Sequence, residues 1–400
     1  MNRASTPTPR YARRKEEILK VASAQINIHG TRGMTLTAVA RELGLDTSSV
    51  TYYFKRKDQL AAACLARSFD WQIGITHQAA AAPSPRARVR AFLALHLDLH
   101  RLQREPGASQ LALLSDLGTL PDDLREPLEA QYQHVFTGVM DFFEPGDDAD
   151  ARRKALIATT IVLSTVYWMP VWIDQYHERD FARIEEQIFD LLEHGLAAQH
   201  PWPTAFDLLE PADGDQAPLT RFLHAATNLI NQRGYIGASV ERIAAQIGVS
   251  TGSFYHHLRN KDDLVVACFE RCFTLIEQAR SLAVTAGGSA GARLARMCSS
   301  LIALQFTGES PLLRISVFQA LPPELRGAML HRAGQFTRQV AGMTSDAMAD
   351  GSIRVIDAPL ASHAIVATIN AAADLRPWAK RRSLEDAVGQ FSAALSRGIF

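Results

Sequence analysis

The chain has 400 residues, with 42 Lys and Arg balanced by 42 Asp and Glu, so its formal net charge is zero. Hydrophobic residues make up 47% and charged residues 21%, which excludes an intrinsically disordered chain and leaves room for two or more packed domains. The four cysteines form no CxxC pair, so they are expected to be reduced core residues in a cytoplasmic protein.

The chain begins with a basic segment, residues 1–15, that lacks the apolar stretch of a secretory signal. Residues 1–67 contain 12 basic side chains against five acidic ones, so the neutral total conceals a basic N-terminal region. We expect a basic arm that reaches a DNA minor groove. A disordered, solubilising tail is an equally good interpretation.

Residues 16–66 have the pattern of a helix-turn-helix domain. Apolar spacing over residues 18–28 predicts a helix that ends at Gly30, and Thr35 is placed to cap a second, short helix. Gly44 then ends the second helix, and Asp46 begins a third. A helix, a short glycine-containing turn and another helix form this DNA-reading unit. In the third helix Val50 and Phe54 are expected to face inward.

The same pattern recurs 204 residues later. Residues 18–64 align with 222–268 without a gap, and 15 of the 47 pairs are identical. Further on, "LPDDLRE" at 120–126 returns as "LPPELRG" at 321–327. A period of this length indicates a duplicated domain rather than a solenoid. We expect a second helix-turn-helix domain at 219–270, after a Pro-, Asp- and Gly-rich linker at 200–218.

The segment "GVSTGSFYHHLRNKDDL" (248–264), preceded by "NQRGYIGASVERIAAQI", resembles the DNA-binding signature of the tetracycline repressor (TetR) family. The first copy departs more, with Ser48 and Thr51 in place of the usual Gly and Tyr. The resemblance implies an all-α fold of two TetR-like units. Each would carry a helix-turn-helix domain followed by a helical ligand-sensing and dimerisation domain, here 67–199 and 271–400.

Outward-facing residues of both helix-turn-helix copies are candidate DNA contacts, because small hydroxyls, glycine and aromatic rings suit close approach to phosphates and base edges. Helix starts and the trailing lysines add phosphate contacts. The resemblance and this pattern together give Thr35, Thr37, Thr47, Ser48, Ser49, Tyr52, Tyr53 and Lys57 in the first copy, and Ser239, Arg242, Thr251, Gly252, Ser253, Tyr255, His256, His257 and Lys261 in the second.

The two sensing regions contain aromatic and polar side chains suited to a small organic ligand, although core packing is the simpler explanation for any single one of them. His96 and His100 lie four residues apart, but with no third ligand evident we expect no metal site. The candidates are Trp71, Phe92, His96, His100, Phe136, Tyr167, Trp168, Met169 and Trp172 in the first region, and Phe306, Arg314, Phe318, Phe336 and Asn370 in the second.

The uncharged stretch 155–173 has the length of a short membrane span, but its Thr, Ser and Pro residues favour a buried helix. No catalytic motif stands out, so we expect neither an enzyme nor a cofactor. The sequence predicts a cytoplasmic, ligand-responsive repressor that binds double-stranded DNA. One chain would act as a pseudo-dimer on an asymmetric operator, alone or as a dimer of pseudo-dimers. In the alternative, only one helix-turn-helix binds DNA and the other unit is a scaffold.

Overall fold

The structure is a computed structural model that describes residues 8–105, 107–108, 110–114, 117–198, 202–209, 217–249, 252, 258–308, 311–314, 317, 321 and 323–400. The elements within these residues are helices. One isolated β-bridge also pairs Ala197 with Ile353. The expected all-α fold is therefore confirmed.

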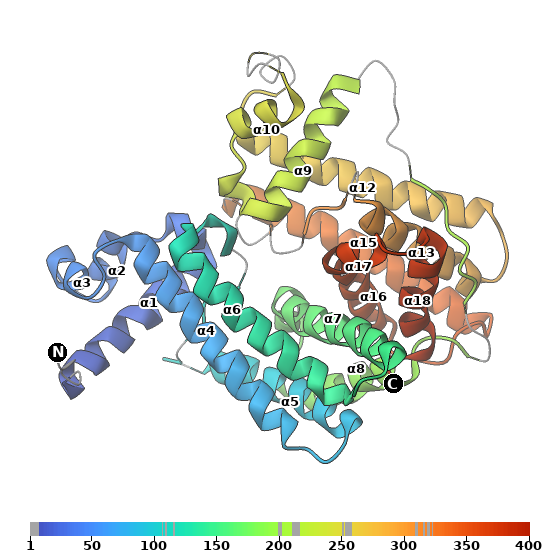
Figure 1. Ribbon diagram of the computed structural model, residues 1–400, viewed down its shortest axis with the longest axis horizontal. Helices are drawn as coiled ribbons and strands as arrows, with labels where there is room; N and C mark the ends of the chain where they lie inside the picture. The colour runs from blue at the N-terminus through green and yellow to red at the C-terminus, as the bar shows by residue number, and fades with distance from the viewer. Residues whose placement is uncertain are drawn as a thin grey trace.

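The first unit occupies the left and lower parts of Figure 1, in blue to green. Its 3-10 turns are η1 (Leu117–Thr119), η2 (Asp141–Phe143), η3 (Ile173–Gln175) and η4 (Glu178–Asp180). Its α-helices are α1 (Pro9–Gly33), α2 (Leu36–Glu42), α3 (Thr47–Tyr53), α4 (Lys57–Ala80), α5 (Pro85–Arg104), α6 (Asp122–Met140), α7 (Ala149–Trp172) and α8 (Phe181–His194).

The second unit repeats this order in yellow to red, with its helix-turn-helix domain at the top of Figure 1. One 3-10 turn, η5 (Ala372–Leu375), precedes a short helix. The α-helices are α9 (Ala217–Gly237), α10 (Val240–Ile247), α12 (Lys261–Thr285), α13 (Ala290–Thr307), α15 (Pro323–Ala349), α16 (Ala358–Ala371), α17 (Arg376–Ala379) and α18 (Leu384–Arg397).

The basic segment at the start of the chain is partly helical, which corrects the expectation of an arm over residues 1–15. Helix α1 begins at Pro9, and the Thr8 side chain accepts a hydrogen bond from the Tyr11 amide. A hydroxyl cap followed by proline is a strong helix start. Residues 9–15 are therefore the first turns of α1, while residues 1–7 lie outside the described residues.

The helix-turn-helix copies share the local structure that the sequence predicts. Gly30 and Gly234 have φ of 69° and 70°, a left-handed conformation that favours glycine and kinks the preceding helix. Thr35 and Ser239 each cap the next helix, accepting from the amides of Ala38 and Arg242. Asp46 precedes α3 as expected, but its side chain makes no capping hydrogen bond.

The last helices of both units pack together as one bundle. Helix α7 lies against α16, and α8 contacts α16 and α18. Gly195 and Gly398 follow α8 and α18, and a Cβ on either one would overlap the backbone of the opposite unit. The two backbones are close enough to form hydrogen bonds between the units, from Leu196 N to Leu395 O at 3.0 Å and from Ile399 N to Leu192 O at 2.8 Å.

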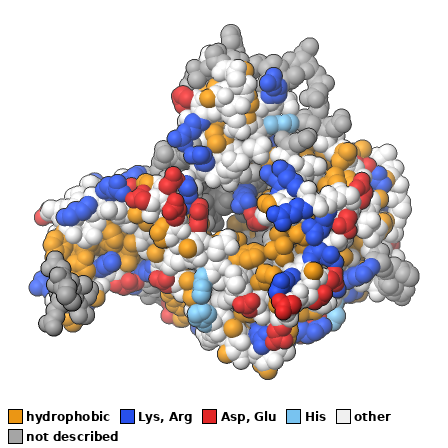
Figure 2. Space-filling view, in the orientation of Figure 1, with side chains coloured by type: hydrophobic (Ala, Val, Ile, Leu, Met, Phe, Trp, Pro, Cys, Tyr) orange, Lys and Arg blue, Asp and Glu red, His pale blue; other side chains and the backbone are white. Residues whose placement is uncertain are grey.

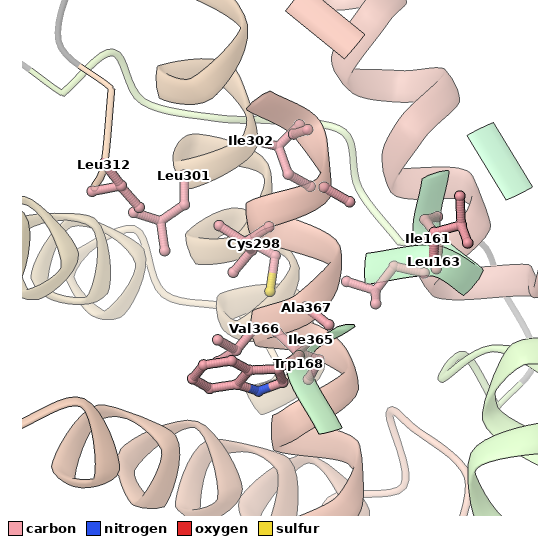
Figure 3. Packing of buried hydrophobic residues seen from close by; sticks show 14 of the residues in the cluster. Ile161, Leu163, Trp168, Cys298, Leu301, Ile302, Leu312, Ile365, Val366 and Ala367 are labelled. Carbon is pink, nitrogen blue, oxygen red and sulfur yellow. The ribbon is translucent and has the colours of Figure 1, made fainter. Parts of the chain in front are cut away.

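Side chains strengthen this contact between the units. The indole of Trp172 stacks on the ring of His363, with centroids 4.7 Å apart and planes 13° from parallel. Arg354 donates to Gly195 O at 2.7 Å and to the Asp190 carboxylate at 2.6 Å. A continuous apolar core joins the units, and Figure 3 shows Ile161 and Trp168 of α7 in the same cluster as side chains of the second unit.

The long apolar helix α7 is explained by this packing. In the window with mean hydropathy 1.7, 72% of the residues are buried inside the protein. Residues of α7 contribute to the shared core on more than one side, so its sequence does not need a membrane to account for it.

The linker differs from the free spacer that its composition suggests. Its described part, 202–209, lies on the second unit, with the indole of Trp202 buried. The Asp207 amide donates to Ser300 Oγ at 2.9 Å, and Arg296 donates to the Asp207 carboxylate at 2.5 and 2.7 Å. These contacts hold the Asp207 pKa below its usual value, chiefly through the Arg296 hydrogen bonds. Residues 202–209 of the linker are therefore part of the packed structure.

Candidate nucleic-acid interface and sensing cavity

The first helix-turn-helix domain presents a polar face over a small core of its own. Val50 is fully buried and Phe54 is 6% exposed, as the sequence predicts. On the opposite side Thr37, Ser48, Tyr52 and Lys57 are exposed, while the remaining candidates are exposed or partly buried: Thr35, Thr47, Ser49 and Tyr53. The candidate side chains thus share one accessible surface made by α2, α3 and the start of α4.

An aromatic cluster on this surface includes a residue that the sequence pattern did not single out. Tyr11 of α1 packs against Tyr53 with ring centroids 4.7 Å apart, and lies 6.3 Å from Tyr52. Tyr52 itself is 67% exposed. One turn after Tyr11, the Lys15 ammonium lies 5.8 Å from the Phe54 ring centroid. Tyr11 and Lys15 are spaced i, i+4, and this spacing was the sequence signal that residues 11–15 belong to a helix.

The second helix-turn-helix domain is described in part. Val240, Ile243 and Ala244 form its buried face, while Arg242 is exposed and Ser239 and Lys261 are partly buried. Gly252 is exposed. Five candidates lie outside the described residues: Thr251, Ser253, Tyr255, His256 and His257. Figure 2 shows Lys and Arg side chains on both lobes that carry these domains.

Two segments of the chain, residues 18–64 and 222–268, match the family described as bacterial regulatory proteins, tetR family. Both helix-turn-helix domains belong to the TetR family. The matched segments coincide with the two domains, so the expected tandem duplication is confirmed. The matched family is one of regulatory proteins.

Curated relatives are named as transcriptional regulators of the helix-turn-helix type. The HTH-type transcriptional regulator BetI of Burkholderia thailandensis is 30% identical over 126 residues, covering 31% of this TetR chain and 62% of BetI. BetI of Paraburkholderia phymatum is 29% identical over 126 residues, covering 31% and 61%. The chain thus spans about three fifths of the length of these relatives.

Two solved structures each match about half of this chain. AibR in complex with isovaleryl coenzyme A and operator DNA is 22% identical, with coverage of 46% of this chain and 99% of AibR and a TM-score of 0.38. The regulator FadR from Bacillus subtilis in complex with stearoyl-CoA is also 22% identical, with coverage of 45% and 98% and a TM-score of 0.36.

In each TetR unit an asparagine clamps the helix-turn-helix domain to the sensing domain. Asn27 of α1 donates to Leu111 O and accepts from the Leu113 amide, both at 2.9 Å. In the second unit, Asn231 of α9 donates to Leu312 O at 2.9 Å and accepts from the Arg314 amide at 2.8 Å. A side-chain amide that both donates and accepts fixes the backbone of this segment firmly.

A neighbouring pair of positions reinforces each clamp. Ser68 donates to Ala112 O at 2.8 Å, and its counterpart Cys272 accepts from the Leu313 amide at 3.2 Å. Arg271 also donates to Pro311 O at 3.2 Å. The segment after α5 or α13 is therefore bonded to two helices of its helix-turn-helix domain, and any displacement of it is transmitted there.

The second unit contains an apolar cavity of about 60 Å³ beside its clamp. Leu312, Leu313 and Cys272 contribute to its wall, so the clamped segment and the cavity share residues. Trp168 of α7 closes one side from the first unit, and Figure 3 shows it beside Val366 of α16. Burial raises the pKa of the Cys272 thiol, which therefore stays protonated and neutral.

Three of the predicted ligand residues line this cavity: Trp168, Phe336 and Asn370. Others lie elsewhere. Trp71 is 44% exposed on α4, and Arg314 is exposed and paired with Asp374. Phe306 packs against Trp378 and Phe391. Phe318 lies outside the described residues. The remaining candidates sit in the core of the first unit or against it: Phe92, His96, His100, Phe136, Tyr167, Met169 and Trp172.

The two core histidines of α5 are neutral side chains. Burial lowers the pKa of His96 and of His100 to about 4 each. His96 Nδ1 lies 2.8 Å from Phe92 O, and its Nε2 lies 2.8 Å from the Gln72 side-chain amide. A neutral imidazole donates from one nitrogen and accepts at the other. Both atoms that face the ring are oxygens, Phe92 O and Gln72 Oε1, so the single ring N–H of the neutral side chain donates to one of them.

Proposed function

We propose that this TetR chain is a cytoplasmic, ligand-responsive repressor that binds an asymmetric DNA operator as an intramolecular pseudo-dimer. The observation that carries the proposal is the bundle of α7, α8, α16 and α18, which joins two helix-turn-helix domains within one chain. Two-fold related recognition elements read half-sites about one helical turn apart. One chain then supplies both of them.

Contacts between the units also hold each helix-turn-helix domain. The η1 segment of the first unit lies against α9 of the second, where a Cβ on Gly118 would lie 2.9 Å from the Arg233 carbonyl carbon. In the reverse direction, Arg326 donates to Asn27 O of the first domain at 3.5 Å. Each DNA-binding domain therefore depends on the sensing domain of both units for its position.

The proposed response to a ligand runs through the second clamp. A small molecule in the cavity contacts Leu312 and Leu313, whose backbone is bonded to Asn231 and Cys272. Displacing this segment shifts α9 relative to α12. A ligand changes operator affinity by as much as its affinity differs between the two arrangements.

Footprinting of the full chain on DNA from around its own gene tests the proposal. The expected result is protection of two half-sites about one helical turn apart, by a particle that light scattering shows to contain one chain or two. Protection of one half-site only would favour the alternative in which one helix-turn-helix domain is a scaffold. Separate Lys57→Ala and Lys261→Ala variants then identify the working domain, since the loss of a phosphate contact lowers both the affinity and its salt dependence.

A further inference from the structure

The cavity of the second unit has a counterpart position in the first, and the repeat allows the two to be compared residue by residue. Helices α5 and α13 both begin after a capping serine, Ser84 and Ser289, which sets their alignment. Helices α6 and α15 begin within the repeated "LPDDLRE" and "LPPELRG" segments, and their aligned Val139 and Val340 are both fully buried. Residues that are aligned in the sequence therefore occupy matching places in the packing of the two units.

Two cavity positions carry a bonded polar pair in the first unit. Ile276 and Leu301 line the cavity of the second unit. Their counterparts are Gln72 and His96, which hydrogen-bond to one another at 2.8 Å in the buried core. Because His96 also bonds to its own helix at Phe92, this pair joins α4 to α5 and places polar groups where the second unit has Ile276 and Leu301.

Two further positions differ in size. Ala333 and Thr337 of α15 line the cavity, whereas the aligned residues of α6 are Tyr132 and Phe136. The Tyr132 ring lies 6.3 Å from that of Phe136 and 6.5 Å from that of Phe69. Consistent with these larger side chains, α4 and α6 of the first unit contact each other over a long stretch, whereas α12 and α15 of the second unit contact each other over a short one. The first unit's site is closed by aromatic side chains.

The open site has a definite chemistry. The residues that line it carry no charge. The Trp168 Nε1 group is buried and has no hydrogen-bond partner among the described residues. Asn370 uses its Nδ2 to donate to Val366 O at 2.9 Å, which leaves its Oδ1 as an acceptor. A buried donor without a partner is costly, and a ligand oxygen would satisfy it.

The volume limits the size of the ligand. About 60 Å³ is less than half of the roughly 150 Å³ of an apolar cavity that admits benzene. We propose that the chain has a single effector site, in the second unit, for one compact, uncharged, chiefly apolar molecule with one hydroxyl or carbonyl group. The first unit supplies Trp168 to this site and has lost its own. That the bound molecule acts as an effector rests on the proposed function, whereas the location and the number of binding sites do not.

Xenon-pressurised crystals of the full chain test the number of sites, because xenon enters apolar cavities regardless of operator binding. One xenon position per chain is expected, between α12, α15 and Trp168. Xenon at the matching place in the first unit, or none in the second, would overturn the inference. The variant Tyr132→Ala/Phe136→Thr, which copies the second unit, is expected to gain a xenon position between α4 and α6.

The reciprocal variant, Ala333→Tyr/Thr337→Phe, tests the ligand class with 2-butanol as the probe. Wild type should melt at a higher temperature than this variant by a margin that grows as 2-butanol is added, because binding stabilises the folded state. A margin that does not change with 2-butanol contradicts the proposed chemistry. Xenon and 2-butanol bound in the second unit without any change in operator affinity would leave the single site standing and contradict the ligand response.

Discussion

At the scale of single residues, Tyr52 offers the clearest test of the DNA-binding face. Its ring is 67% exposed on α3 and packs edge-on against Tyr53, 5.2 Å away. Tyr52→Ala is expected to weaken operator binding by about 1–3 kcal/mol, the range for a side chain that contacts bases. Fluorescence anisotropy with labelled operator measures this. Trp71→Ala, which removes an exposed aromatic side chain from α4, is the control and should bind like wild type.

Asn231 and Asn27 form a matched pair for the coupling between cavity and DNA-binding domain. Each makes two hydrogen bonds to the segment that follows α13 or α5, and each loss should cost about 1–3 kcal/mol of stability. Of the two, only Asn231 is bonded to a residue that lines the cavity, Leu312. Asn231→Ala should therefore abolish the effect of a ligand on operator affinity, while Asn27→Ala retains it. Equal ligand responses in both variants would contradict transmission through the second clamp.

Buried His96 makes stability depend on pH. Its pKa is about 4 in the folded chain and about 6.5 when exposed, so the unfolded chain binds the proton more tightly. Stability is thus unaffected above pH 6.5, falls as the pH drops from 6.5 to 4, and levels off below 4. Lowering the pH from 7 to 5 should reduce the free energy of unfolding by about 2 kcal/mol through this histidine.

Urea unfolding at the two pH values measures this loss. The variant Gln72→Ile/His96→Leu installs the pair found in the second unit and removes the titrating group without leaving its partner unbonded. The variant should lose about 2 kcal/mol less than wild type. An identical loss in both proteins would show that His96 is already charged, or solvated, in the folded chain.

At the scale of elements, the sequence predicted most of what local chemistry decides. The kinks at Gly30 and Gly234, the caps at Thr35 and Ser239 and the buried Val50 follow from spacing and residue type. The start of α1 was missed although Thr8 and Pro9 are a local signal for it, whereas the docking of the linker depends on partners distant in the sequence. Asp207, for example, is held by Arg296, 89 residues away.

The sensing candidates show the same limit. Composition could identify Trp168 as large and apolar, but not that it faces the cavity of the other unit. Trp71 has the same residue type and lies at the surface. The difference between a closed and an open site depends on four aligned positions in helices α4, α5 and α6. Only the packing shows that they meet at one place.

The junction between the units depends on two glycines. Gly398 has φ of 89°, and a Cβ there would overlap the carbonyl of Glu193 in the first unit. Gly398→Ala should destabilise the chain by about 3 kcal/mol or more, because the strain and the overlap both act against the interface. Urea unfolding measures it. Gly74→Ala, in the middle of α4 with open space around it, should instead stabilise by up to about 1 kcal/mol.

At the scale of the whole molecule, fusion changes what two DNA-binding domains can do. In a homodimer the two recognition helices are identical, which favours a palindromic site. Here one bundle within the chain holds two domains whose outward faces differ. The aligned outward pairs that differ are Ser48 with Gly252, Thr51 with Tyr255 and Tyr52 with His256, whereas the trailing lysines are identical. The two faces expected to read DNA thus present different side chains.

We therefore expect selection from random DNA to return an operator with two unlike half-sites. A chimera in which residues 47–53 are replaced by the sequence of 251–257 should select a more palindromic operator, because both domains then present the same side chains to the bases. Exchanging the exposed Ser345 for Ala on α15 is a control that should leave the selected sequence unchanged. If wild type already selects a palindrome, the two faces read the same bases and the fusion serves assembly alone.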